Sequence, residues 1–230
     1  MAPDFSLIFA GFELMNLRLP RVYCLTSDRI KMSHSQQVSF FCEAGIRLIQ
    51  LRSKKLTHSE LQLEASKSVE VCNQFNAKLI INDSVDITKS TDADGVHLGK
   101  DDMNLMKARE VLGDTKLVGV TIHSEDEISD ITHEFADYAG LGPFRNSRTK
   151  SELNPKLAEN DYSNIIHLLK PMPVFLIGGI NSQDFTSILR LGNHGLAVCS
   201  ALSHNLSLDN SKIKEFISES EKHDKILALN

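Results

Sequence analysis

Short apolar runs rich in β-branched residues alternate with amphipathic segments along most of the chain. We expect eight of these runs to be strands, at residues 22–26, 48–52, 79–83, 95–98, 117–122, 138–142, 174–179 and 195–202. Helix-like segments separate most of them, at 58–75, 104–112, 124–135, 160–170 and 181–192, and the short connection 84–94 leaves room for one or two turns. Strands that alternate with helices in this way predict a parallel sheet with helical crossovers.

The number of units favours one particular closure of that sheet. Eight β units without a Pro/Ser-rich linker predict a single α/β domain, and a (β/α)8 TIM barrel is favoured over a doubly wound open sheet. We expect the barrel, with a helical tail on its outside, to span residues 21–230. Residues 1–20 are expected to be an N-terminal extension or extra helix, or in part an over-extended start upstream of Met15.

Composition excludes several classes of protein. The 230 residues are 41% hydrophobic and 24% charged with a formal net charge of −5, which argues against a general nucleic-acid binder. Since no apolar run approaches the ~20 residues of a membrane span, we expect no membrane partner. Cys24, Cys42, Cys72 and Cys199 lie far apart in the sequence, so we expect free thiols in a reducing, cytoplasmic compartment.

The second predicted strand carries an unusual polar face. In the stretch IQLRSK, Gln50, Arg52 and Lys54 alternate with Ile49, Leu51 and Ser53. A closed barrel has no sheet edge, so the two cations would face the barrel mouth, where an anionic ligand is their natural partner. In an open sheet the same residues would be a solvated edge.

Polar side chains also follow the next two strands. Asn82 and Asp83 end the third strand, and Asp101 and Asp102 follow the fourth. One carboxylate from each of two neighbouring strand ends suits Mg²⁺, which usually takes one or two carboxylates and completes its shell with water and phosphate oxygens. The alternative is structural: Asp102 would cap the following helix and Asp83 would cap a turn.

The fifth strand ends with Thr121 and His123 at alternate positions. His123 would serve either as an acid or base or as a hydrogen-bonded rim histidine. Ser124 and Glu127 have the spacing of a capping box. Within the fourth strand, His97 is expected to be a hydrogen-bonded interior group rather than a metal ligand.

The loops after the last three strands suggest a second anion site. The segment GLGPFRNSRTK (140–150) offers hydroxyls and cations for a phosphate clamp, although a long solvated loop would have a similar composition. The glycines of IGGIN (177–181) and the serine of VCSAL (198–202) lie where (β/α)8 barrels often hold a phosphate. A diphosphate site near the second to fourth strands and a monophosphate site near the seventh and eighth are therefore expected.

Taken together, these motifs resemble one family. IQLRSK, IND, ADGVHLGKDDM, GVTIHS, YAGLGP followed by SRTK, IGGI and CSALS occur at successive strand ends between about residues 21 and 203. Their order is similar to that in the thiamine phosphate synthase family of (β/α)8 enzymes, which also includes thiazole tautomerase relatives. The resemblance implies a Mg²⁺-dependent transferase that joins 4-amino-2-methyl-5-hydroxymethylpyrimidine diphosphate to a thiazole ethyl phosphate, releasing pyrophosphate.

The resemblance also implies roles for individual residues. The pyrimidine diphosphate would be bound by Gln50, Leu51, Arg52, Ser53, Lys54, Asn82, Thr121 and Lys150, of which Arg52, Lys54 and Lys150 would be catalytic by stabilising the leaving group. The thiazole phosphate would be bound by Ser147, Arg148, Thr149, Gly179, Cys199 and Ser200, with Cys199 contributing its backbone, and Mg²⁺ would be bound by Asp83 and Asp102. This chain departs from the family pattern at Lys100, where glutamine is more usual, at Cys199, which replaces an aliphatic residue, and at the additional cations Arg145 and Arg148.

Two other functions remain as alternatives. A tautomerase-like isomerase would use His123 as a proton shuttle and need no diphosphate site, and a non-catalytic binder of thiamine precursors would keep the pocket without turnover. The expected partners are small-molecule substrates, and a homo-oligomer is left open. The sequence does not distinguish a carboxylated from a plain thiazole phosphate.

Overall fold

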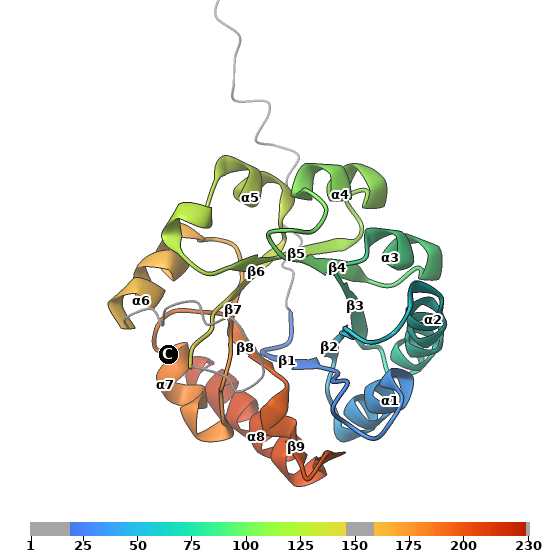
Figure 1. Ribbon diagram of the computed structural model, residues 1–230. Coiled ribbons are helices and arrows are strands. Elements are labelled where there is room, and N and C mark those ends of the chain that lie inside the picture. Colours follow the sequence, from blue (N-terminus) through green and yellow to red (C-terminus); the bar gives the residue numbers. More distant parts are fainter. Residues whose placement is uncertain (1–18, 146–158, 229–230) are drawn as a thin grey trace, which may run out of the picture.

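The computed structural model describes residues 19–145 and 159–228, and within them eight parallel strands close into a barrel in chain order (Figure 1). The strands are β1 (Val22–Leu25), β2 (Leu48–Leu51), β3 (Lys78–Asn82), β4 (Gly95–Leu98), β5 (Leu117–Ile122), β6 (Tyr138–Leu141), β7 (Val174–Ile177) and β8 (Gly195–Val198). β1 pairs with β8, for example through Tyr23 and Ala197, which closes the ring. The predicted (β/α)8 barrel is confirmed, and the open sheet is excluded.

Helices surround the barrel. Those at 58–75, 104–112 and 160–170 match the predicted segments to within two residues, whereas 124–135 and 181–192 each form a 3₁₀ turn followed by a shorter helix. The helices are α1 (His34–Ala44), α2 (His58–Gln74), α3 (Val85–Thr91), α4 (Leu105–Leu112), α5 (Asp130–Phe135), α6 (Glu159–Leu168), α7 (Phe185–Leu189) and α8 (Asn210–Leu227). Short 3₁₀ turns are η2 (Glu125–Glu127), η3 (Ser182–Asp184) and η4 (Ser200–Leu202), and β9 (Ser203–His204) pairs with β10 (Ser207–Leu208). Ser33 and Thr57 begin α1 and α2 as capping boxes, which satisfy the first free N–H groups of each helix.

The sequence periodicity explains the two cores of the molecule. Along each strand alternate side chains point to opposite faces, so one set fills the barrel and the other contacts the helices. The interior set contains three aromatic rings, Tyr23, Tyr138 and Phe175, which meet edge to face at 5.4–5.8 Å between ring centroids. The edge-to-face arrangement is favourable for such rings and fills the barrel without a channel.

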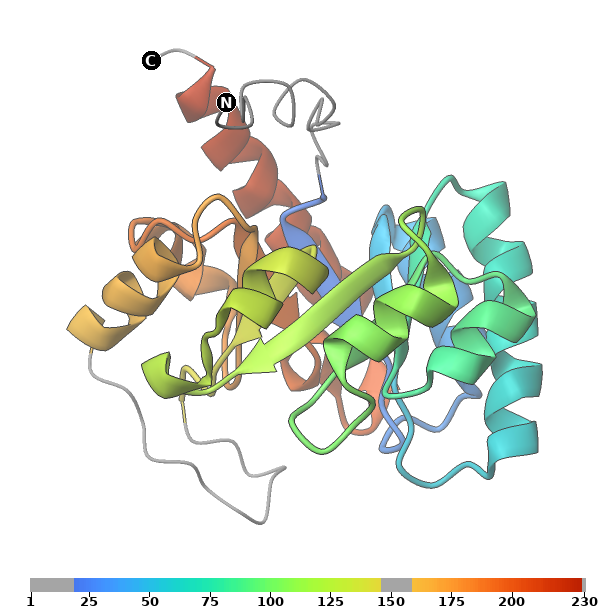
Figure 2. The ribbon, with the colours of Figure 1, turned by 90° about the horizontal axis from the view of Figure 1, so that it is seen from above.

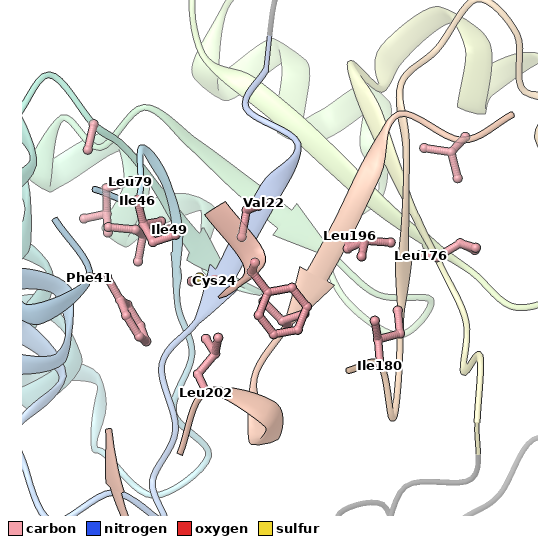
Figure 3. Close-up of a cluster of buried hydrophobic side chains, with 14 of the residues drawn as sticks. Val22, Cys24, Phe41, Ile46, Ile49, Leu79, Leu176, Ile180, Leu196 and Leu202 are labelled. Atoms are coloured by element: carbon pink, nitrogen blue, oxygen red, sulfur yellow. The ribbon is translucent and has the colours of Figure 1, made fainter. Parts of the chain in front are cut away.

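The outer set packs between the strands and the helices. Ile46, Ile49 and Leu79 gather on the outside of the barrel beside Phe41 of α1 (Figure 3). The tail helix α8 lies between α7 and α1 and is anchored by buried Ile213 and Phe216, so it is docked by an apolar face although most of its residues are polar. The four cysteines are free, and Cys199 is the one among them that is not fully buried.

One sequence expectation, for the N-terminus, lies outside the described residues, and another, on membrane spans, is tested by the described helices. The N-terminal extension or extra helix falls almost entirely within residues 1–18, which lie outside the described residues. None of the helices described here is both long enough and apolar enough to cross a membrane.

Gly119 in β5 makes room for the central aromatic cluster. A Cβ at this position would lie 2.2 Å from Cζ of Tyr138, whose ring is fully buried inside the barrel. We expect Gly119→Ala to lower the free energy of unfolding by about 1–3 kcal/mol, because the ring or the strand must shift to remove the overlap. Urea denaturation with an unchanged m-value measures this loss, and a change below about 0.3 kcal/mol would show that the barrel interior is not close-packed here.

Candidate functional site

The carboxyl ends of the strands meet at one rim of the barrel. Figure 2 shows the β5 arrowhead directed toward the side of the molecule where the loops after β1 and β2 also lie. From β2 onward, three alternate residues rise toward this rim: Gln50 is 3% exposed, Arg52 is half-buried, and the Lys54 side chain is 60% exposed. The polar face of IQLRSK therefore runs from the barrel interior to its mouth.

A chain of hydrogen bonds crosses the interior below the rim. Gln50 Nε2 donates to the Tyr23 hydroxyl at 2.9 Å, and the Tyr23 and Tyr138 hydroxyls are 2.9 Å apart. His97 continues the chain, with Nδ1 at 3.2 Å from Tyr138 Oη and Nε2 at 2.9 Å from Thr121 Oγ1. The chain thus links Gln50 on β2 to Thr121 on β5, both of which are candidate contacts for the pyrimidine.

The two ring nitrogens of His97 are both occupied in this chain, which confirms the expected interior role. Burial lowers the pKa of His97 to about 4; the charge of Asp83 acts to raise this pKa, and the charge of Arg52 acts to lower it by a smaller amount. The imidazole is therefore neutral near pH 7. The sequence alone does not indicate a polar role for Tyr23 and Tyr138, because an inward tyrosine looks like an ordinary core residue until the partners of its hydroxyl group are known.

Acidic and basic groups from three strand ends meet at the rim. Lys54 Nζ lies 2.5 Å from Asp83 Oδ2, and Asp83 is in turn close enough to Asp102 for their carboxyl groups to interact. Burial, the adjacent Asp83 side chain and its charge raise the pKa of Asp102, against the lowering effects of the Gly99 N–H and Lys54. Asp83 also has a φ of 65°, a left-handed conformation that is uncommon for a non-glycine residue and found often at functional sites.

The helix-cap alternative for Asp102 is wrong. Ser84 is the N-cap of α3 and Asn104 is the N-cap of α4, so neither Asp83 nor Asp102 caps the following helix. Asp102 instead accepts a hydrogen bond from the Gly99 N–H at 2.7 Å, which holds its carboxylate over the rim.

The acidic pair fits a small divalent cation. Burial is the main cause of the raised pKa of Asp102, and the neighbouring Asp83 adds to it because two carboxylates held together repel each other. A bound Mg²⁺ would remove that repulsion. No group of three or more His, Cys, Asp or Glu side chains able to hold a metal occurs in residues 19–145 and 159–228. A two-carboxylate set still suits Mg²⁺ when substrate phosphates supply other ligands.

The side chains of Leu51 and Ser53, which were expected to bind the pyrimidine diphosphate, contact other parts of the protein in this structure. Leu51 is fully buried and packs in the outer core, so its side chain points away from the barrel interior. The Ser53 hydroxyl donates to Asp28 Oδ1 at 2.5 Å. Asn82, the last residue of β3, is half-buried and pairs in register with His97, which places it beside the interior chain.

The rim near β5 holds His123 in a local contact. Glu127 Oε2 accepts from the His123 N–H at 2.7 Å and lies 3.3 Å from His123 Nδ1. The predicted capping box is therefore wrong: Ser124 makes no side-chain cap bond, and α5 is capped by Ser129 instead. The segment 124–135 is split into η2 and α5 for this reason.

The rim near β6–β8 is built around two glycines with positive φ, Gly178 at 107° and Gly179 at 62°. A Cβ on Gly179 would lie 2.8 Å from Cβ of Arg145, so the β6 loop packs directly on this turn. Cys199 faces the barrel interior, and Ser200 is exposed at the start of η4. Of the expected phosphate clamp, Ser147, Arg148, Thr149 and Lys150 lie outside the described residues.

Arg145 is held by an acidic partner. Its guanidinium makes two bonds to Asp184, at 2.5 and 2.7 Å, and donates to Gly179 O at 3.0 Å. The extra cation noted in the sequence therefore ties the β6 loop to the β7 turn. Hydrogen bonding to Arg145 is the main reason that the pKa of Asp184 is below its usual value.

This ion pair predicts an acid-dependent stability. A carboxyl with a depressed folded-state pKa stabilises the fold above its unfolded pKa of about 3.9 and loses that contribution as pH falls through the folded value. We expect Arg145→Gln to lower the free energy of unfolding at pH 7 by about 0.5–1 kcal/mol, since the Arg145 side chain is 43% exposed and screened by solvent. The difference from the unsubstituted protein should shrink below about pH 4. The exposed Arg190, replaced by glutamine, is the matched control and should show no such pH-dependent difference.

Comparison with known proteins shows consistent similarity. The family described as "Thiamine monophosphate synthase" matches residues 22–202. Proteins named thiamine-phosphate synthase are similar to this chain: that of Flavobacterium psychrophilum is 38% identical over 71% of this chain and 81% of its own, and that of Dictyoglomus turgidum is 33% identical over 90% and 94%. Among solved structures, thiamine phosphate pyrophosphorylase from Pyrococcus furiosus superposes with a TM-score of 0.77 at 26% identity, covering 88% of this chain and 96% of that one. Phosphoribosyl anthranilate isomerase from Thermus thermophilus, at 13% identity and a TM-score of 0.60, shares the fold alone.

Proposed function

The chain belongs to the thiamine monophosphate synthase family and is an enzyme that forms thiamine phosphate, and we propose that its reaction is Mg²⁺-dependent and dissociative. We place this reaction at the rim formed by the carboxyl ends of the strands. The substrates would be 4-amino-2-methyl-5-hydroxymethylpyrimidine diphosphate and a thiazole ethyl phosphate. The observation that carries the proposal is the contact of Lys54, Asp83 and Asp102 beside the half-buried Arg52.

The residues at the rim suit a leaving group that gains charge. In the proposed reaction the bond between the methylene carbon and the diphosphate oxygen breaks, and its electron pair leaves with pyrophosphate. The thiazole nitrogen then supplies the pair for the new carbon–nitrogen bond. Arg52 and Lys54 would stabilise the departing pyrophosphate, as would Lys150 from the loop outside the described residues, because fixed cations at a developing charge lower the barrier most.

The acidic pair would have a separate task. Asp83 and Asp102 would hold Mg²⁺, which neutralises phosphate charge when it is bound. In the described structure Lys54 is the cation that contacts Asp83, so binding of the diphosphate would allow Lys54 to exchange this partner for a phosphate oxygen. The rim is therefore arranged with its cations already near the place where the charge develops.

The two ends of the barrel mouth would take different parts of the substrates. Gln50, Asn82 and Thr121 line the side of β2, β3 and β5, where their polar groups suit the pyrimidine ring. The Gly178–Gly179 turn and Ser200, with Cys199 beneath them, suit a monophosphate held by backbone N–H groups at the ends of β7 and β8. Cys24, Cys42 and Cys72 are buried free thiols, which supports the proposal that the enzyme works in the reducing cytoplasm.

A pyrophosphate-release assay tests the proposed reaction. The protein is mixed with Mg²⁺, the pyrimidine diphosphate and either the plain or the carboxylated thiazole phosphate, and pyrophosphate and thiamine phosphate are measured together. Equal amounts of both products with one thiazole form support the synthase and identify its substrate. Isomerisation of the thiazole without pyrophosphate release would support the tautomerase alternative. Binding without any turnover would support the non-catalytic alternative.

A further inference from the structure

A hydrogen-bonded cluster between the β1 and β2 strand ends is not explained by substrate binding. It contains Thr26, Asp28 and His34 from the first βα unit, together with the backbone of Arg52 and Lys54. Thr26 is 1% exposed, and the side chains of His34 and Asp28 are 7% and 16% exposed. Buried polar side chains are normally hydrogen-bonded, and a fully bonded network of them makes the surrounding structure rigid.

The cluster contacts the main chain at the residues that carry the rim cations. Thr26 Oγ1 accepts from the Arg52 N–H at 2.9 Å, and Asp28 Oδ2 accepts from the Lys54 N–H at 2.8 Å. Between them, the Ser53 hydroxyl donates to Asp28 Oδ1. Residues 52 and 54 are two apart in an extended segment, so their side chains lie on the same face. The bonds from their N–H groups run roughly perpendicular to those side chains and leave the guanidinium and ammonium groups available for other contacts.

His34 joins the two acceptors. Its Nδ1 lies 2.8 Å from Thr26 Oγ1, and its Nε2 lies 3.1 Å from Asp28 Oδ1. With the proton of a neutral ring on Nε2, the donors run in one direction: from the Arg52 N–H to Thr26, from the Thr26 hydroxyl to His34, and from His34 to Asp28. Every polar atom in the series then has a partner, and the β1 loop and first turn of α1 become one support for the end of β2.

The position of Asp28 argues against a direct role in binding. A free carboxylate beside a diphosphate site would repel the ligand, but both oxygens of Asp28 accept bonds from Ser53, Lys54 and His34. Although burial acts to raise its pKa, these bonds hold the pKa of Asp28 below its usual value. The Lys54 ammonium contacts Asp83 rather than Asp28, so Asp28 contacts Lys54 through its backbone.

We propose that Asp28 and His34 are positioning residues that fix the backbone of Arg52–Lys54 so that both cations point to the departing pyrophosphate. This inference rests on the proposed function, and it adds two residues that contact no substrate. Two like charges on one short segment repel each other, and although Asp83 contacts Lys54, this side-chain contact does not fix the backbone that carries both cations. The support from β1 keeps them in place before the substrate arrives, which is what preorganisation requires.

The test compares alanine with a conservative replacement. We expect Asp28→Ala to lower kcat by about 10–100-fold, as loss of a residue that orients a site group commonly does, while the KM for the thiazole phosphate stays within about twofold. Asp28→Asn keeps an oxygen for the Lys54 N–H. Its amide N–H can donate to His34 Nε2 once the ring takes the other tautomer and the Thr26 hydroxyl turns to Arg52 O, so this variant should recover most of the rate. A role for the Asp28 charge itself would leave the asparagine variant as impaired as the alanine variant, and this result would overturn the proposal.

A double-substitution cycle shows whether Asp28 acts through Lys54. If it does, adding Asp28→Ala to Lys54→Ala should lower kcat by much less than it does in the unsubstituted protein. If the fall in kcat of the double variant equals the product of the falls in the two single variants, the proposal is contradicted. The chain offers a matched control in its surface pair His58–Asp86, where Nε2 and Oδ2 are 2.5 Å apart, and Asp86→Ala should leave kcat unchanged.

Amide hydrogen exchange gives a readout that does not depend on turnover. Asp28→Ala should speed exchange of the Lys54 amide, and Thr26→Val should do the same for Arg52, with the rest of β2 remaining protected. If Asp28→Ala does not fold, Thr26→Val replaces it as the test variant, and we expect its kcat to fall. Faster exchange with unchanged kcat in active protein would overturn the positioning role. A protein that releases no pyrophosphate in its unsubstituted form would instead refute the proposed function.

Discussion

Replacing Arg52 with alanine is expected to slow pyrophosphate release by about 100-fold or more while the barrel stays folded. The Arg52 charge acts on groups at two other strands: it adds to the lowering of the pKa of His97 on β4 that burial mainly causes, and it opposes the rise that burial causes in the pKa of Cys199 after β8. Loss of one preorganised donor to a developing charge removes stabilisation that exists mainly in the transition state. The fall should therefore appear in kcat as well as in kcat/KM.

The neighbouring lysine provides the control for this prediction. Lys55 is exposed and lies three residues further along the same loop, so Lys55→Ala removes the same charge without affecting the rim. Steady-state pyrophosphate release and thermal unfolding are measured for both variants. Turnover of folded Arg52→Ala protein within about threefold of the unsubstituted rate would remove Arg52 from the proposed machinery.

Replacing Asp102 with asparagine is expected to weaken Mg²⁺ binding without lowering the stability of the fold. Asp102 is an acid with a raised folded-state pKa, so its ionised form costs stability at neutral pH, and the neutral amide removes that cost. The asparagine oxygen can still accept from the Gly99 N–H. We therefore expect unchanged or slightly higher stability without Mg²⁺, together with a fall in Mg²⁺-dependent turnover of about 100-fold.

Ligand-induced stabilisation measures the same loss without catalysis. Mg²⁺ with pyrophosphate should raise the Tm of the unsubstituted protein, since a ligand at 100 times its Kd stabilises by about 2.7 kcal/mol, and this rise should be largely absent in Asp102→Asn. The exposed neighbour Asp101, replaced by asparagine, is the control and should keep the full rise. Retention of both the Tm rise and the turnover in Asp102→Asn would exclude Asp102 as a metal ligand.

The cap assignments show where local pattern reading failed. Asp102 is of a residue type suited to capping the helix after β4, yet Asn104 takes the N-cap position. The difference is two residues along the chain, and sequence propensity does not resolve helix boundaries that finely. Similarly, Ser124 and Glu127 match a capping box, but Glu127 bonds to His123 because η2 ends after a single turn.

Most of the fold followed from periodicity alone. Eight β-branched runs with helices between them are enough to predict the barrel, because each strand buries both faces and each helix buries one stripe. The candidate chemistry at the strand ends could also be predicted, since parallel strands bring their carboxyl ends to the same rim. Gln50, Arg52, Lys54, Asp83 and Asp102 were all found in this way.

What the sequence by itself determined about this protein is therefore the order of its elements, its family and the rim on which its polar residues gather. Only the tertiary structure decided which of them touch: Lys54 with Asp83, Asp83 with Asp102, Arg145 with Asp184, and Asp28 and His34 with the backbone after β2. The physical reason is that alternation along a strand specifies a face, whereas a hydrogen bond or ion pair depends on distances between atoms from different strands. Those distances exist only once the barrel has closed.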